Sequence, residues 1–220
     1  MLAPWILMWG WLALLDGGRY RTLTERLRGA SFETDQTSEG QQTRQRWKIA
    51  GTGSVTVDFL IPPSSPTDQG GRLRNIESDF AAVIAPGLTL AFRDRRRVRI
   101  DGRTILGEKA TREVWVCGPG AFVVLKALAF VGRGENKDAY DLFYLLRNYG
   151  RGVSDVVAEL RPLFPDESAA RALEYLRADF KDSESIGPRR VAEFLYGRTD
   201  ANTQADAVGF VRQLLDECKA

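Results

Sequence analysis

The chain of 220 residues contains no histidine. This absence excludes Ser-His-Asp and Cys-His catalysis, imidazole acid–base chemistry and histidine-ligated zinc sites. Any catalysis must therefore come from carboxylates, lysine, arginine, hydroxyl groups or a bound ion.

Cysteine is nearly absent as well, since the chain has only Cys117 and Cys218. Two cysteines so far apart in the sequence form neither a disulfide framework nor a metal-ligand pattern, which suits a reducing cytoplasm. We interpret Cys117, in an apolar predicted strand, as a small buried residue; a reactive thiol is the alternative.

The sequence has no GxxxxGK[ST] or GxGxxG loop, and its net charge is only +2. With 44% hydrophobic and 27% charged residues, its composition is typical of a globular protein. The small net charge gives no overall electrostatic attraction to nucleic acid or to a membrane. Gly118-Pro119-Gly120 opens a predicted helix whose N-terminus could hold an anion, although the pattern is weak.

Arginines gather locally in the segment FRDRRRVRI, residues 92–100. Alternate members would share one side of a strand and could steer phosphates. No aromatic residue interleaves with them, so stacking of single-stranded bases is not predicted. We favour a solvated hairpin.

The first fifteen residues, MLAPWILMWGWLALL, carry no charged side chain. They are too few to span a bilayer as a helix and lack a basic region or an Ala-x-Ala cleavage site. An apolar core segment, a membrane or signal segment, and the product of a misplaced start remain three interpretations.

The order of predicted elements indicates an α+β fold with two subdomains. Residues 1–117 read as a mixed sheet with flanking helices, and residues 118–220 as an all-helical subdomain. Strands are expected at RWKIAG, SVTVDFLIPP, LTLAF, RRVRI, RTIL and EVWVC, with a hairpin turn at Asp101-Gly102. ETDQTSEGQQTRQ is expected as a loop and RNIESDFAAVIA as a helix closed by Pro86-Gly87.

Charged residues interrupt two apolar predicted helices that follow residue 118. Lys126 and Arg133 lie two turns apart on one face of the first helix. Asp138 and Asp141 share a face of the second, and the short link makes the helices neighbours. The spacing predicts that Lys126 lies within ion-pair reach of Asp138 or Asp141. A structural ion-pair network that locks the helices together, including Lys137 with Asp141, explains the same pattern.

Asp58 stands near the end of the predicted strand SVTVDFLIPP, where alternation places it on one face with Leu60. An acid at a strand end is well placed to hold a divalent ion. A solvent-facing acid on a half-exposed sheet is the alternative.

These segments resemble the AbiEii/MenT-type nucleotidyltransferase family of bacterial toxins, usually encoded beside an antitoxin. The resemblance rests on the strand VTVDFLIPP, on the strand–GPG–helix that carries Lys126, and on RGENKDAYDLFYLL. It covers about residues 14–150, and its most specific part is Lys126 followed by KDAYDL. It implies a nucleotidyltransferase-like sheet before the helical half.

The resemblance also implies chemistry: transfer of a nucleotide from a nucleoside triphosphate to RNA, such as tRNA, with Mg²⁺. It makes Asp58 a metal ligand and catalytic acid, together with Asp138 and Asp141 as catalytic acids. Lys126, Arg133 and Lys137 become the residues that bind the nucleotide, Lys126 with a catalytic role as well. Asp58 and Lys126 are then expected to border one cleft.

The family's Gly-Ser and Asp-x-Asp elements should precede residue 16, yet residues 1–15 contain no acid, serine or arginine. We therefore expect an N-terminally incomplete subdomain and no detectable turnover, since Mg²⁺ needs convergent carboxylates. The alternative function is that of a catalytically dead relative, which binds nucleotide, nucleic acid or an antitoxin in the cytoplasm.

Overall fold

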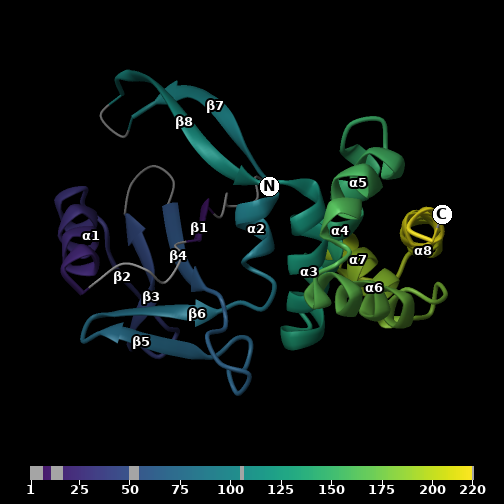
Figure 1. Cartoon of the computed structure of the whole chain (residues 1–220), viewed down its shortest axis with the longest axis horizontal. Coiled ribbons are helices and arrows are strands. Elements are labelled where there is room, and N and C mark those ends of the chain that lie inside the picture. Colours follow the sequence, from purple (N-terminus) through teal and green to yellow (C-terminus); the bar gives the residue numbers. More distant parts are fainter. Residues whose placement is uncertain (1–6, 11–16, 50–54, 105–106, 220) are drawn as a thin grey trace. The chain divides into compact units, whose positions relative to one another are not determined.

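The computed structural model describes the chain except for residues 1–6, 11–16, 50–54, 105–106 and 220 (Figure 1). It has two compact units. The first comprises Met1–Leu88 with Arg99–Glu113, and the second comprises Thr89–Val98 with Val114–Ala220. The predicted α+β class is confirmed, because a mixed sheet is followed by an all-helical C-terminal half. The predicted boundary at residue 117 stays a prediction.

The first unit is built on a six-stranded mixed sheet and one helix. The sheet has the order β2-β3-β4-β6-β5, with β1 pairing parallel to β4. Strands β3 and β4 are antiparallel, whereas β4 and β6 are parallel. The bounds are β1 Leu7–Gly10, α1 Gly17–Gly29, β2 Glu33–Gln36, β3 Gln42–Ile49, β4 Val55–Ile61, β5 Leu73–Glu77 and β6 Phe80–Ile84.

Alternation along the strands produces the core of this unit. On β4, Val57, Phe59 and Ile61 are buried, and the residues between them are partly exposed. Trp47 of β3 and Phe80 of β6 complete the buried face. Leu23 and Leu27 of helix α1, four residues apart on one face of the helix, pack against this cluster.

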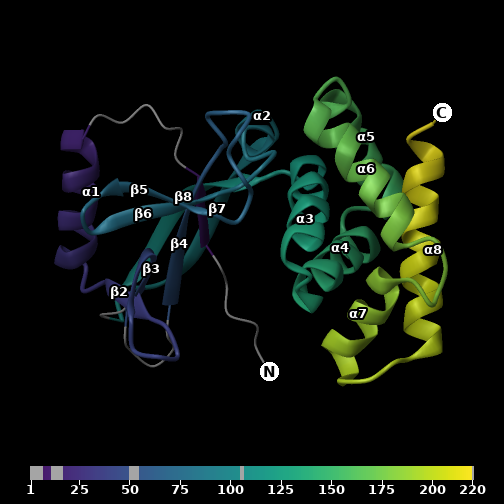
Figure 2. The same ribbon diagram turned by 90° about the horizontal axis from the view of Figure 1, so that it is seen from below.

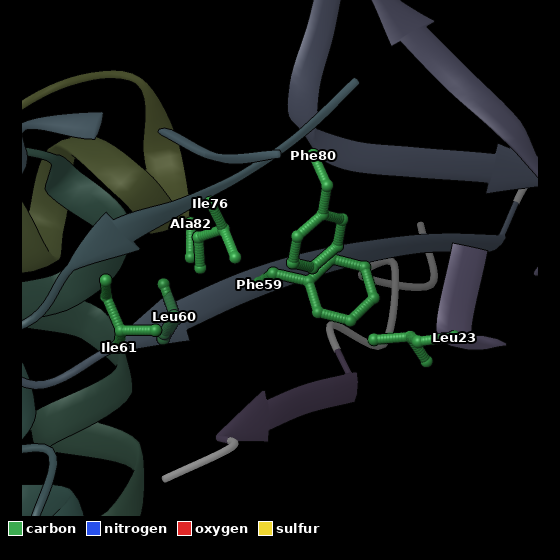
Figure 3. Close-up of a pocket in the computed structure, with 7 residues that line it drawn as sticks. All are labelled: Leu23, Phe59, Leu60, Ile61, Ile76, Phe80 and Ala82. Atoms are coloured by element: carbon green, nitrogen blue, oxygen red, sulfur yellow. The ribbon is translucent and has the colours of Figure 1, made fainter. Parts of the chain in front are cut away.

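One small cavity lies inside this core, between α1, β4, β5 and β6 (Figure 3). Leu23 points toward Phe59, whose ring meets that of Phe80 edge-on at a centroid distance of 4.8 Å. The volume is about 10 Å³ and every lining residue is apolar, so the cavity has room for one water at most and none for a nucleotide.

Two predicted segments of this unit are wrong. Residues 74–85, predicted as a helix, lie for the most part in the antiparallel hairpin β5–β6, because Ser78 and Asp79 turn the chain and Phe80 enters the core beside Phe59. The polar stretch 33–45, predicted as a loop, contributes strand β2 and the start of β3.

The second unit contains the helices after residue 118, as predicted. Their bounds are α3 Pro119–Arg133, α4 Asn136–Asn148, α5 Val153–Leu160, the 3-10 helix η1 Arg161–Leu163, α6 Glu167–Asp179, α7 Ile186–Tyr196 and α8 Ala201–Glu217. Helix α3 packs against α4, α5 and α6 (Figure 2). Most of its apolar residues are buried, so Lys126, which is largely buried among them, needs a partner for its charge.

A two-stranded hairpin and a short helix connect the two parts of the chain. Helix α2 spans Leu90–Arg93, so the predicted strand LTLAF is wrong. The hairpin consists of β7 Arg95–Arg103 and β8 Lys109–Cys117 (Figure 1). The predicted turn at Asp101-Gly102 is wrong, because strand β7 continues through both residues to Arg103. Beyond it, the Gly107 N–H donates to the Thr104 carbonyl. Gly107, with φ +83°, supplies the left-handed turn residue there.

The apolar start of the sequence is described in part. Leu7–Gly10 is strand β1, in register with Val57–Leu60 of β4, so Met8 lies beside Asp58. The other residues of the 1–15 segment lie outside the described part. Among the helices that are described, none has the length and apolarity that crossing a bilayer requires.

Candidate functional site

The charged residues predicted on α3 and α4 form one cluster. It consists of Lys126, Arg133, Lys137, Asp138 and Asp141, here called the charged cluster. The Lys126 ammonium donates to Asp138 Oδ1 at 3.0 Å and lies 2.6 Å from Asp141 Oδ2. The predicted ion pair between the two helices is therefore confirmed.

Asp138 is the centre of the cluster, and its side chain is 0% exposed. Arg133 Nε donates to Asp138 Oδ2 at 2.6 Å and Arg133 Nη2 donates to Oδ1 at 2.7 Å, a bidentate pair. Burial alone would raise the pKa of Asp138, but the Arg133 hydrogen bonds and the Lys126 charge hold it below the usual 3.8. The carboxylate is thus buried in its charged form.

The cations of the cluster differ in exposure. Lys126 is 18% exposed, whereas Lys137 is 35% and Arg133 59% exposed. Lys137 Nζ donates to both oxygens of Asp141, at 3.0 and 2.7 Å. The acids therefore lie inside, and the heads of Arg133 and Lys137 reach toward solvent.

Helix α4 begins without a side-chain cap. Asn136 is the first helical residue, and Glu135 precedes it as the N-cap without a side-chain capping bond. Asn136 Nδ2 instead donates to Glu193 Oε2 of α7 at 3.4 Å. The side chain thus ties α4 to α7.

Asp58 lies in the other unit, on the sheet face opposite to the core. It faces Arg46 on β3, which donates from Nε to Oδ1 at 2.6 Å and from Nη2 to Oδ2 at 2.9 Å. A cross-strand pair of opposite charges is an ordinary stabilising element of a sheet. The predicted convergence of Asp58 with Lys126 on one cleft stays a prediction.

The Mg²⁺ that the resemblance implies does not fit Asp58 in this arrangement, because both carboxylate oxygens accept from the Arg46 guanidinium. A cation bound there would have to displace a bidentate cation. Within the described ranges, no three acid, cysteine or histidine side chains are grouped as a metal site.

The Gly118-Pro119-Gly120 turn has a structural explanation. Asp94, at the end of α2, accepts from the Ala121 backbone N–H through Oδ2 at 2.8 Å, and its backbone carbonyl accepts from the Gly118 N–H. A Cβ on Gly118 would collide with the Asp94 carboxylate. The anion expected at this helix N-terminus is therefore a side chain of the protein itself.

The same turn holds Cys117, which is half-buried. Burial raises the pKa of its thiol to about 12, and the negative charge of Asp94 adds to the effect. The interpretation of Cys117 as an unreactive residue is favoured, because a thiolate is the reactive form.

An aromatic partner for the arginines was missed in the sequence. On β8, Trp115 lies beneath two arginines of β7: Arg95 at 4.4 Å and Arg97 at 5.1 Å from the ring centroid to the guanidinium carbon. These three residues are here called the Arg–Trp face. Trp115 comes from the opposite strand, so the spacing of residues within the arginine-rich segment does not reveal it. A correct prediction of how β7 and β8 pair would have revealed the contact.

The other side of β7 anchors the hairpin. Arg96 donates to the Tyr149 hydroxyl at 2.7 Å and to Glu159 Oε1 at 3.2 Å, both in the helical unit. Side chains alternate along a strand, so Arg96 points away from the Arg–Trp face.

Comparison of the chain with protein families, curated proteins and solved structures gives no match.

Proposed function

We propose that this chain is a nucleotidyltransferase-like protein that binds the phosphates of a nucleoside triphosphate at the charged cluster. The observation that carries the proposal is the buried Asp138 carboxylate, which Lys126 and Arg133 hold where α3 and α4 pack together. The resemblance to AbiEii/MenT-type toxins supports it through the same residues.

The energetics of the cluster favour a binding role over a purely structural one. Apolar residues hold two helices together as well as a buried ion network does, so such a network is weak evidence for stability. What the network does achieve is to fix the position of the cationic groups. The five residues comprise three cations and two acids, and Glu135 acts on Arg133 as a third negative charge, so the exposed heads of Arg133 and Lys137, and not a net charge, are what the cluster offers an anion.

Each residue then has a defined task in the proposal. Arg133 and Lys137 contact the phosphates, because their side chains are the exposed ones. Asp138 and Asp141 orient these cations, and Lys126 bridges both acids. Because two hydrogen bonds to Asp138 already hold the Arg133 guanidinium in place, the side chain loses little conformational entropy when it binds a phosphate.

The remaining properties come from the resemblance. They are transfer of the nucleotide to RNA such as tRNA, dependence on Mg²⁺, a cognate antitoxin and a cytoplasmic location. For this chain we propose binding without turnover. The pairing of Asp58 with Arg46 supports this part, since it leaves the acid engaged.

The test is calorimetric titration of the protein with ATP, CTP, GTP and UTP, with and without MgCl₂. Arg133→Gln and Lys137→Gln should each weaken binding about tenfold or more, as expected when a charge-assisted hydrogen bond is lost. Arg151→Gln is the matched control, because Arg151 also pairs with an acid four residues later, Asp155. Circular dichroism checks that each variant is folded.

Equal affinity of the two cluster variants and the control would refute the site, as would no binding of any triphosphate at millimolar concentration. A second arm incubates the chain with labelled triphosphates, RNA and Mg²⁺, where we expect no incorporation. Strong labelling that disappears in Asp58→Ala would show that the chain turns over and that Asp58 takes part.

A further inference from the structure

We infer that the Arg–Trp face of hairpin β7–β8 binds single-stranded nucleic acid, with a base stacked on Trp115 and phosphates paired with the flanking arginines. The inference concerns binding alone and does not depend on nucleotide transfer or on the charged cluster.

The positive charge of the chain is concentrated on this hairpin. Residues 95–117 contain seven basic and three acidic residues, a net charge of +4, while the whole chain carries +2. The rest of the chain is therefore net negative. Every residue of β7 is exposed, so this charge faces solvent and can attract a polyanion.

The chemistry of the Arg–Trp face matches single strands in particular. Trp115 is 53% exposed, which leaves indole surface for a base. Arg95 and Arg97 lie against the same ring and present planar guanidinium groups, which both stack on bases and bind phosphates. Aromatic platforms flanked by cations are how proteins hold unpaired bases.

The basic side continues along the hairpin. Alternation places Arg99 and Arg103 on the same side of β7 as Arg95 and Arg97. Residues two apart on the strand lie about 7 Å apart, and Asp101 stands between Arg99 and Arg103. At the far end, Arg103 and Lys109 line a surface hollow of about 450 Å³ together with Asp101 and Thr111. Arg95, Arg97 and Arg99 thus follow one another at a spacing that suits the successive phosphates of an extended strand, and Asp101, which pairs with Arg99, marks the end of this uninterrupted run.

A membrane surface fits this side less well. Trp115 is its one large apolar side chain among the described residues of β7 and β8, whereas interfacial binding needs a wide apolar surface. The exposed apolar residues Val98 and Ile100 alternate with the arginines and so point to the other side.

The test measures fluorescence anisotropy of labelled 20-nucleotide RNA, the DNA strand of the same sequence, and the DNA duplex, over a series of salt concentrations. No nucleotide or Mg²⁺ is added. We expect both single strands to bind more tightly than the duplex. The RNA and DNA arms show whether the 2′-hydroxyl contributes.

Two variants separate stacking from charge. Arg95→Gln/Arg97→Gln should weaken binding and lower the slope of log K against log salt by about 1.4, or 0.7 per lost phosphate contact. Trp115→Leu should weaken binding about 5- to 100-fold without changing the slope, and Trp115→Phe should restore part of the loss. Arg189→Gln/Arg212→Gln removes the same charge from α7 and α8 as a control.

The inference is overturned if Trp115→Leu binds RNA and DNA strands like the unmodified protein, or if the control pair lowers the slope as much as the hairpin pair. Preference for the duplex would also overturn it. So would binding to vesicles of anionic phospholipid without binding to either strand, because the hairpin would then be a membrane contact.

Discussion

The Asp94 carboxylate accepts a hydrogen bond from the Ala121 backbone N–H and so caps helix α3 from outside the helix. The two residues are far apart in the sequence, and the bond fixes the junction at which the hairpin enters the helical unit. Gly118 and Gly120 make room for this junction. Gly118 admits the carboxylate, and Gly120 admits the backbone of α5 at Glu159 and Leu160.

Replacing Gly120 by alanine should therefore destabilise the protein by about 1–3 kcal/mol. The added Cβ would lie 2.8 Å from the Leu160 Cα, and backbone cannot yield as a side chain can. Gly209→Ala is the control, because Gly209 lies within helix α8 with no heavy atom near its Cβ position. That variant should gain roughly 0.5–1 kcal/mol. Urea unfolding measures both, and equal effects would contradict the close packing of α3 on α5.

Asp138→Asn should lower the free energy of unfolding by about 3–5 kcal/mol at pH 7, because the cations then lose their buried partner. The pKa of Asp138 is below 3.8 in the folded state and near 3.8 in the unfolded state. The stabilisation is thus fully present above pH 4 and is lost as the pH falls through the folded pKa.

The difference between the unmodified protein and Asp138→Asn should accordingly shrink below pH 4. Urea unfolding from pH 7 to pH 3 measures it. Asp155→Asn, which breaks an exposed pair, should have a far smaller effect. A constant difference down to pH 3 would mean that Asp138 is not held as a carboxylate.

Cys117 should resist alkylation at neutral pH. With a pKa of about 12, its thiolate is scarce, and the rate with iodoacetamide should still rise about tenfold per pH unit between pH 9 and 11. The Cys218→Ser variant isolates this thiol, and mass spectrometry follows the modification. A rate that levels off near pH 9 would show an ordinary, accessible cysteine.

The helical half and the charged cluster follow from sequence because their signals are local. Spacing puts Lys126 and Arg133 on one face of α3, and the short link brings α4 alongside. The burial of Asp138 is less visible, since an acid in a first helical turn also serves the helix dipole. Only the packing of the two helices shows that it is enclosed.

The secondary-structure predictions are wrong where contacts with distant segments of the chain determine the conformation. Residues 74–85 are predicted as a helix, yet Phe80 packs against Phe59 and Ile84 pairs with β4, so the segment joins the sheet. Asp101-Gly102 is a typical turn pair, but Thr111 on β8 donates to Asp101 and the ladder runs on. Trp115 and Asp94 likewise contact residues that are distant in the sequence. The local hydrophobic periodicity of the sequence does not reveal such contacts.

Adjacent arginines of β7 point to opposite sides of the strand and contact different partners. Arg96 donates hydrogen bonds to Tyr149 and Glu159, while Arg95 and Arg97 lie over the Trp115 ring. Insertion or deletion of a single residue in β7 would move every following side chain to the opposite side of the strand. An arginine that now bonds Tyr149 and Glu159 would then lie over Trp115, and one that now lies over Trp115 would face Tyr149 and Glu159. The length of this strand is therefore as tightly constrained as its composition.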